Sequence, residues 1–250
     1  MADVTTRNLQ IRLLILLVLA FIPAMGFFWY ANKELRSLQL EAKEQELIRR
    51  ADVVAAEYQG LLDQSRAAMA ALAELPDIRA SRTPGCAEHM ERILRHSEHY
   101  TTISIVGMDG YLSCGAITPE DPLYLGDRTY FTRATSRHAF SVGDFALGRI
   151  TGKPGLGLAF PIMDDGEVLT VVGATLDLTT LGPGPAEGPL PKGYTFTILD
   201  RNGRVMVRTP RTGDFTLADS VGSMAGPDFP PLPEGPDPVM VSGTDLDGVR

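Results

Sequence analysis

The sequence predicts an α+β protein: an N-terminal membrane-spanning helix runs into a long helix, and two serial modules built on antiparallel sheets follow. Three observations support this prediction. Leu13–Tyr30 contains no charged residue, residues 33–75 are rich in helix-forming residues, and one hairpin pattern occurs twice, about ninety residues apart. Uncharged runs of about 20 residues span membranes, and alternating strands around short turns form antiparallel sheets.

The uncharged run predicts a transmembrane helix over residues 13–32, which is about the length needed to cross ~30 Å of hydrocarbon. Trp29 and Tyr30 lie where aromatic residues meet lipid headgroups. The alternative is a cleaved signal peptide, for which Ala24-Met25-Gly26 offers a site with small residues. Both interpretations place the rest of the chain outside the cytoplasm, and the first makes residues 1–12 a cytoplasmic N-terminus.

Residues 33–75 predict a long helix that ends before Pro76, because proline disfavours helical geometry in the residue before it. Its apolar positions advance by steps of four and three. Such a seam packs either against a second copy, giving a homodimer, or against the domain that follows. The seam consists of Leu47, Ala51, Val54, Tyr58, Leu61, Ser65, Ala68, Leu72 and Leu75.

The remaining sequence predicts two modules, over residues 76–182 and 194–250, joined by a linker rich in proline and glycine at 183–193. Few residues follow the second hairpin, so the second module is expected to be incomplete. The predicted elements are a helix at Cys86–Tyr100, hairpins at Ile103–Cys114 and Phe196–Val207, and strands at Ser141–Leu147, Gly157–Met163 and Val168–Leu178.

The net charge argues against one class of partner, and the cysteines indicate a possible disulfide. There are 23 Lys and Arg against 31 Asp and Glu, a formal net charge of -8, which repels nucleic acid. Cys86 and Cys114 are the two cysteines. An even number of cysteines in an oxidising compartment favours a disulfide, with two buried thiols as the alternative, and their spacing matches no metal site.

The stretch Asp127–Leu178 combines an arginine, aromatic residues, acids and a glycine-rich loop between predicted strands, which indicates a small-ligand pocket. The chain contains no G-x-S-x-G, H-E-x-x-H or Walker motif. It is therefore expected to bind a ligand without a cofactor or metal and not to catalyse a reaction.

Two motifs carry a resemblance to a known family. The run Asp127-Arg128-Thr129-Tyr130-Phe131, the segment Gly143–Pro154 and the order of elements resemble the double Cache (PAS-like) extracellular sensor domains of bacterial transmembrane receptors. The resemblance covers about residues 33–250. It implies a periplasmic sensor anchored in the inner membrane, with a histidine kinase, cyclase or chemoreceptor output beyond residue 250, and it supports the Cys86–Cys114 pair.

The resemblance also implies roles for individual residues. In such domains Arg128 would bind a carboxylate, with Tyr130 and Phe131 forming the wall or floor of the pocket. In the branch that binds amino acids, Asp144 and Asp177 would hold the α-amino group. In a branch that senses short dicarboxylates, Arg149 or Lys153 would take the second carboxylate.

The leading hypothesis is therefore a sensor that binds a small organic acid or an amino acid beside Arg128. A different class of function is a membrane-anchored structural or dimerisation module that works through its long helix without a ligand. The remote alternative is an exported hydrolase with a dispersed active site.

Overall fold

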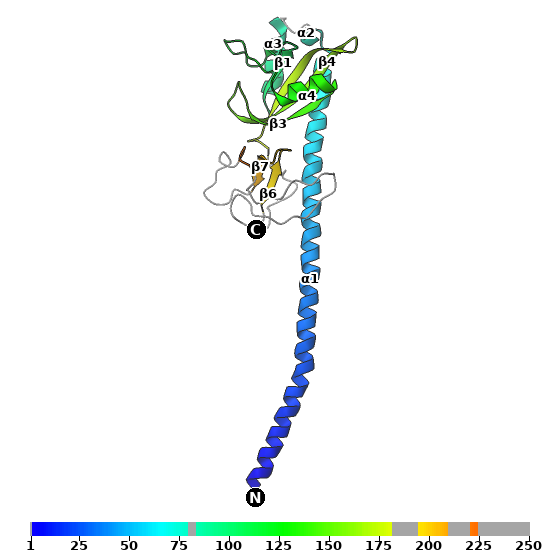
Figure 1. Ribbon diagram of the computed structural model, residues 1–250, viewed down its shortest axis with the longest axis vertical. Helices are drawn as coiled ribbons and strands as arrows, with labels where there is room; N and C mark the ends of the chain where they lie inside the picture. Colours follow the sequence, from blue (N-terminus) through cyan, green and yellow to red (C-terminus); the bar gives the residue numbers. More distant parts are fainter. Residues whose placement is uncertain (1, 80–83, 182–194, 210–220, 225–250) are drawn as a thin grey trace. The chain divides into compact units, whose positions relative to one another are not determined.

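The computed structural model describes the chain except for residues 1, 80–83, 182–194, 210–220 and 225–250; for much of 2–44 only the backbone is described. Two compact units are present, Met1–Val53 and Val54–Arg250. Figure 1 shows the helices and strands coloured along the chain and labels most of them. The predicted linker, and most of the predicted second module, lie outside the described residues, so the division into modules stays a prediction.

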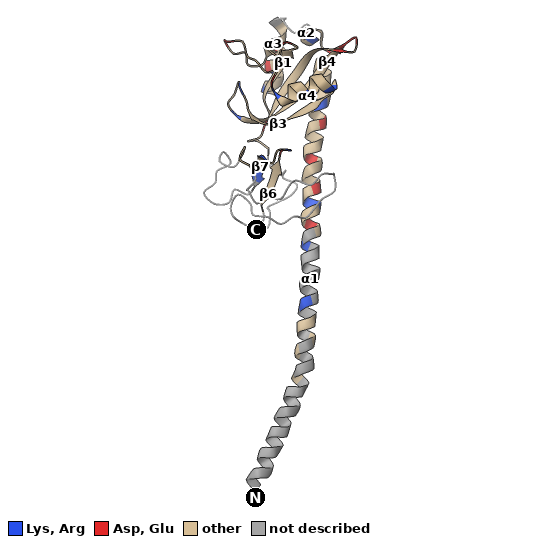
Figure 2. Cartoon of the chain, viewed as in Figure 1, with Lys and Arg blue, Asp and Glu red and all other residues tan. Residues whose placement is uncertain are grey.

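A single helix, α1 (Ala2–Ala73), covers both the predicted span and the predicted long helix. A search of the described residues finds no helix that is both long and apolar enough to cross a membrane. Most side chains of the predicted span are outside the description. Acidic and basic residues succeed one another along the described part of α1, as Figure 2 shows, and Glu46 accepts hydrogen bonds from Arg49 and Arg50 one turn on.

The C-terminal third of α1 packs against the domain that follows it in the sequence. Val54, Ser65, Met69 and Ala73 are buried, and the hydroxyl of Tyr100 donates to Ser65 Oγ at 2.6 Å. The apolar seam was expected to pack against a second copy of the chain or against the domain that follows. In this part of the helix it contacts the domain that follows. Two hydrogen bonds of the i to i−3 type, from the amides of Glu74 and Leu75, close the helix before Pro76.

A five-stranded antiparallel sheet, in the order β2-β1-β5-β4-β3, forms the centre of the second unit. A tight turn connects two neighbouring strands of this sheet. Asp165 and Gly166 both have positive φ angles (48° and 87°) between β4 and β5, the backbone that a two-residue hairpin requires. The strands are β1 (Tyr100–Gly107), β2 (Leu112–Gly115), β3 (Ser141–Leu147), β4 (Pro154–Asp164) and β5 (Glu167–Asp177).

Helices cover both faces of this sheet. On one face α1 joins α2 (Pro76–Arg79) and α3 (Pro84–Arg95) around a core that includes Met90, Ile105 and Leu158. On the other face α4 (Thr129–Arg137) packs against β3, β4 and β5. The prediction of one helix over Cys86–Tyr100 was wrong at its end, because Tyr100 already pairs with Leu176 in the sheet.

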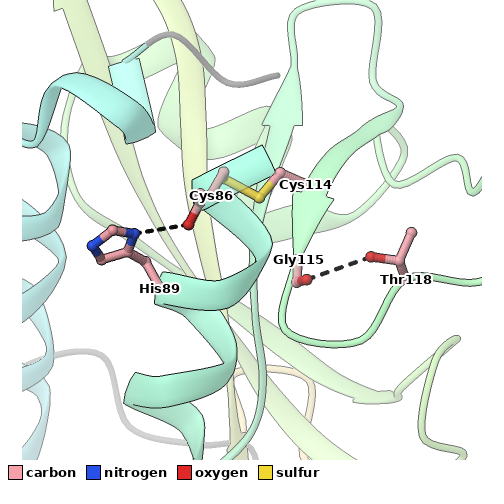
Figure 3. Close-up of a disulfide and its surroundings, with 6 residues drawn as sticks. Cys86, His89, Cys114, Gly115 and Thr118 are labelled. Atoms are coloured by element: carbon pink, nitrogen blue, oxygen red, sulfur yellow. Dashed lines mark hydrogen bonds between the residues drawn. A yellow bond between two sulfur atoms is a disulfide. The ribbon is translucent and has the colours of Figure 1, made fainter. Parts of the chain in front are cut away.

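The predicted disulfide is confirmed. Cys86 in the first turn of α3 bonds to Cys114 in β2, with 6.3 Å between their Cα atoms (Figure 3). Both residues are buried in the core between the helices and the sheet. One turn beyond Cys86, the His89 ring nitrogen Nδ1 lies 2.7 Å from the carbonyl oxygen of Gly85. The cross-link therefore fixes the start of α3 to an edge strand.

The second hairpin forms a two-stranded antiparallel sheet from β6 (Phe196–Leu199) and β7 (Val205–Thr209). Its turn is held by the carboxylate of Asp200, which accepts hydrogen bonds from the backbone amides of Asn202 (2.8 Å) and Arg204 (2.9 Å). This is the local bonding by which aspartate stabilises turns. The hairpin was predicted from the same pattern as β1–β2, and both are present.

Candidate functional site

The sheet face that packs against α4 is apolar at one end and carries small or hydroxylated residues at the other. Beneath α4 the strands present apolar residues, Val106 and Val171 among them. Further along, the strands present small or hydroxylated residues, because side chains alternate between the two faces of a sheet. The register places Thr175 between Thr102 and Gly157, and Gly173 between Ser104 and Ala159.

These small residues form the floor of a cavity of about 320 Å³, which is at the lower end of the range for small-ligand sites. The first residues of α4 and the segment that links β3 to β4 complete its walls. Its lining comprises Thr102, Ser104, Leu125, Asp127, Arg128, Thr129, Tyr130, Asp144, Phe145, Ala146, Leu147, Gly148, Arg149, Ile150, Thr151, Gly155, Gly157, Gly173, Ala174 and Thr175.

The ring of Tyr130 lies directly against the backbone of β4. A Cβ atom at Gly157 would overlap Cδ1 of Tyr130 and lie 2.6 Å from Cε1, so only glycine leaves room for the ring. Burial raises the pKa of the Tyr130 hydroxyl, an effect that the nearby charge of Arg128 partly offsets. The hydroxyl is therefore neutral at physiological pH and retains its proton for hydrogen bonding.

Arg128 precedes the first residue of α4 and has extended backbone angles (φ −70°, ψ 135°). Its Nη2 donates to the carbonyl oxygen of Leu147 at 3.0 Å. Among the residues that the structure describes, no carboxylate forms an ion pair with Arg128. A guanidinium has five N–H donors, so most of those on Arg128 are available to a molecule in the cavity.

Arg149, the second arginine in the lining of the cavity, already forms an ion pair within the protein. Arg149 forms two hydrogen bonds of 2.6 Å with the carboxylate of Asp127, and it also donates to the carbonyl oxygen of Tyr124. The hydrogen bonds from Arg149 hold the pKa of Asp127 below its ordinary value. The side chains of Arg149 and Asp127 are 36% and 51% exposed, so water screens this pair, which lies at the rim of the cavity and contributes little stability.

Asp144 lies in a β-bulge of the edge strand β3. Val142 pairs with Leu158 and Phe145 with Leu156, so Gly143 and Asp144 together lie opposite Gly157. The extra residue re-aims the strand and brings the carboxylate of Asp144 into the lining of the cavity.

That carboxylate already has two cationic partners. Arg133 of α4 binds both of its oxygens, at 2.9 and 2.8 Å, and Nε of Arg201 in the β6–β7 turn lies 3.2 Å from Oδ1. The same turn also contacts the next residue, because the amide of Phe145 donates to Asp200 Oδ2 at 3.2 Å. The two arginines therefore balance the charges of the carboxylates of Asp144 and Asp200, and these four groups are neutral together.

Asp177 and Lys153 form an ion pair of 3.1 Å outside the lining of the cavity. Asp177 is buried and also accepts hydrogen bonds from the amide and the hydroxyl of Thr179. Burial raises the pKa of Asp177, but the hydrogen bonds from Thr179 and Lys153 outweigh it, so the net shift is downward. Asp177 is therefore ionised and satisfied by its protein partners.

The structure thus brings together four of the seven residues predicted for the ligand: Arg128, Tyr130, Asp144 and Arg149 all line the cavity. Lys153 and Asp177 pair with each other outside the lining, and Phe131 is buried in the core beneath α4. The sequence prediction missed Thr102, Ser104 and Thr175, although alternation along β1 and β5 was a signal for their common face. Among the described residues, no group of His, Cys, Asp and Glu is arranged to hold a metal ion.

No family model and no curated protein sequence matches this chain. Solved structures with a similar fold do exist. The ligand-binding domain of the Pseudomonas aeruginosa PAO1 amino acid chemoreceptor PctB, in complex with L-Arg, is 20% identical with a TM-score of 0.57, covering 78% of this chain and 82% of that one. The sensor domain of the V. cholerae histidine kinase DctB is 18% identical with a TM-score of 0.54, covering 68% of each chain.

A third similar structure is the ligand-binding domain of the Pseudomonas fluorescens chemoreceptor CtaA in complex with L-serine. It is 18% identical with a TM-score of 0.51, and the match covers 69% of this chain and 72% of that chain. All three neighbours are input domains of bacterial receptors, and two of them have an amino acid bound. This chain therefore has the fold of the ligand-binding domains of bacterial chemoreceptors and sensor histidine kinases.

Proposed function

We propose that this chain is the extracytoplasmic input region of a membrane signalling receptor, and that it binds a small carboxylate in the cavity beside Arg128. The observation that carries the proposal is the guanidinium of Arg128, which lines the cavity with one backbone carbonyl as its partner among the described residues. A guanidinium matches a carboxylate with two parallel hydrogen bonds. The fold, shared with receptor input domains, agrees with this role.

The charges around the cavity favour an organic acid over an amino acid. Asp144, the carboxylate in the lining that would hold an α-amino group, is already neutralised by Arg133 and Arg201. Asp177 is likewise engaged by Lys153 and Thr179. An ammonium group would have to displace these partners, whereas a carboxylate gains from the positive charge of Arg128, which no described carboxylate pairs with. An amino acid remains the second candidate, because PctB and CtaA of the same fold have been solved with amino acids bound.

The predicted segment Leu13–Tyr30 would anchor this sensor in the membrane with the cavity on the outer side. Fractionation of cells that express the chain with or without residues 13–32 tests the anchor. Recovery of the intact chain in the soluble fraction would contradict it.

A thermal-shift screen of the purified chain against short organic acids and amino acids tests the binding site. A ligand at one hundred times its dissociation constant stabilises the folded state by about 2.7 kcal/mol. We expect Arg128→Ala to remove the shift. Arg137→Ala is the matched control, because Arg137 is an exposed arginine in the last turn of α4 and outside the lining. A shift that survives Arg128→Ala would show that the ligand binds elsewhere.

A further inference from the structure

One hydroxyl in the floor of the cavity has no partner. Thr102 is 8% exposed and lines the cavity from β1. Its Oγ1 is the one buried side-chain nitrogen or oxygen, among the described residues, that lacks a hydrogen-bond partner. Buried polar atoms in folded proteins are nearly always paired, so an unpaired hydroxyl in a ligand cavity calls for an explanation.

Neighbouring threonines on the same strands show that local geometry does not prevent pairing. The hydroxyl of Thr101 donates to the carbonyl oxygen of Thr175 at 3.3 Å, and the hydroxyl of Thr170 donates to that of Val106 at 2.8 Å. Both hydroxyls use backbone carbonyls of the adjacent strand. Thr102 differs from them in that it lines the cavity, where water or a bound molecule can be its partner.

The surroundings of Thr102 allow a ligand to come close. Its cross-strand neighbour is Thr175, and beyond Thr175 the ring of Tyr130 occupies the space that Gly157 leaves, so a ligand that reaches Thr102 would also contact this ring. Arg128 lines the same cavity. One small molecule in this volume can therefore contact both the guanidinium and the hydroxyl.

We propose that Thr102 binds a second polar group of the ligand, so that the site selects short acids with a carboxylate at one end and a hydroxyl or carboxylate oxygen at the other. This inference rests on the proposed carboxylate site at Arg128. A threonine hydroxyl both donates and accepts, so either distal group can satisfy it. An acid with an apolar end would leave the hydroxyl unpaired and would bind more weakly.

Three four-carbon acids test the selection: butyrate, 4-hydroxybutyrate and succinate share a chain length and differ at the distal carbon. Calorimetry on the full chain measures their affinities. We expect 4-hydroxybutyrate or succinate to bind about tenfold more tightly than butyrate, the effect of about one hydrogen bond. In Thr102→Val this preference should disappear, while the affinity for butyrate stays unchanged.

The stability of the ligand-free protein provides an independent measurement. Thr102→Val removes a hydroxyl that has no protein partner, so we expect its melting temperature not to fall while selectivity is lost. Thr101→Val, the matched control, removes a paired hydroxyl, so it should lower the melting temperature and leave the preference intact. If Thr102 were merely structural, Thr102→Val would lower the melting temperature together with the selectivity.

Several outcomes would overturn this inference and leave the Arg128 site standing. They are equal binding of all three acids to the wild-type chain, a preference that survives Thr102→Val, or no binding of these acids while an amino acid binds in an Arg128-dependent way. Binding that is independent of Arg128 overturns the proposed site itself.

Discussion

Removing the disulfide is expected to destabilise the second unit substantially. The bond joins residues 28 apart in the sequence, and the chain-entropy model gives about 3.6 kcal/mol at 25 °C for a loop of 28 residues. In a domain of this size that free energy corresponds to a fall of roughly 7–14 °C in melting temperature. Replacing both buried cysteines with alanine adds roughly 1–2 kcal/mol more, because two sulfur atoms leave the core.

Urea unfolding followed by circular dichroism separates these two contributions. Reduction of the wild-type chain reports the cross-link alone, and the variant Cys86→Ala/Cys114→Ala reports the cross-link together with the lost packing. Reducing agent should not change the double variant, which serves as the control. If reduced and oxidised wild-type chains unfold within about 1 kcal/mol of each other, the cross-link does not stabilise this fold in the way the entropic model requires.

Two further predictions concern the cavity and its surroundings. Gly157→Ala should displace the ring of Tyr130, cost about 1–3 kcal/mol of unfolding free energy and weaken ligand binding. Gly60→Ala on α1, whose added Cβ meets nothing within 4 Å, should instead stabilise the chain by about 0.5–1 kcal/mol; equal effects of the two substitutions in urea unfolding would refute the steric argument. Asp177 has a lowered pKa in the folded state, so its stabilisation is present above the ordinary value of 3.8 and is lost as pH falls through the lower folded-state pKa. Melting temperatures measured across this acidic range should therefore fall more steeply for the wild-type chain than for Asp177→Asn, and parallel curves would contradict the assignment.

Most elements of the fold could be predicted from local patterns. Apolar alternation and turn residues identified both hairpins and the strand Ser141–Leu147, which matches β3 residue for residue. Helix α4 was missed for a physical reason. It begins after Arg128 without a side-chain cap, so the usual start signal is absent. Thr129, Thr132 and Thr135 also have low helix propensity, and contact with the sheet compensates for it.

The candidate site was predictable where one short motif supplies the residue. Arg128 and Tyr130 come from such a motif, and both line the cavity. The partners of Asp144 could not be foreseen, because Arg201 is distant in the sequence and reaches Asp144 only through the fold. Alternation along β1 indicates the face on which Thr102 lies, but its neighbours on that face depend on strand register, which local patterns do not determine.

The bulge at Gly143 and Asp144 also bears on how copies of this domain meet one another. Strand β3 is an edge of the five-stranded sheet, and an edge strand exposes backbone groups that can recruit the edge of another molecule. The bulge interrupts the regular ladder at this edge, and the amide of Phe145 is already taken by Asp200. The opposite edge, β2, is four residues long and is tethered to α3 through Cys114. The two edges are therefore protected against sheet-to-sheet aggregation, one by irregular geometry and the other by short length and a covalent tether.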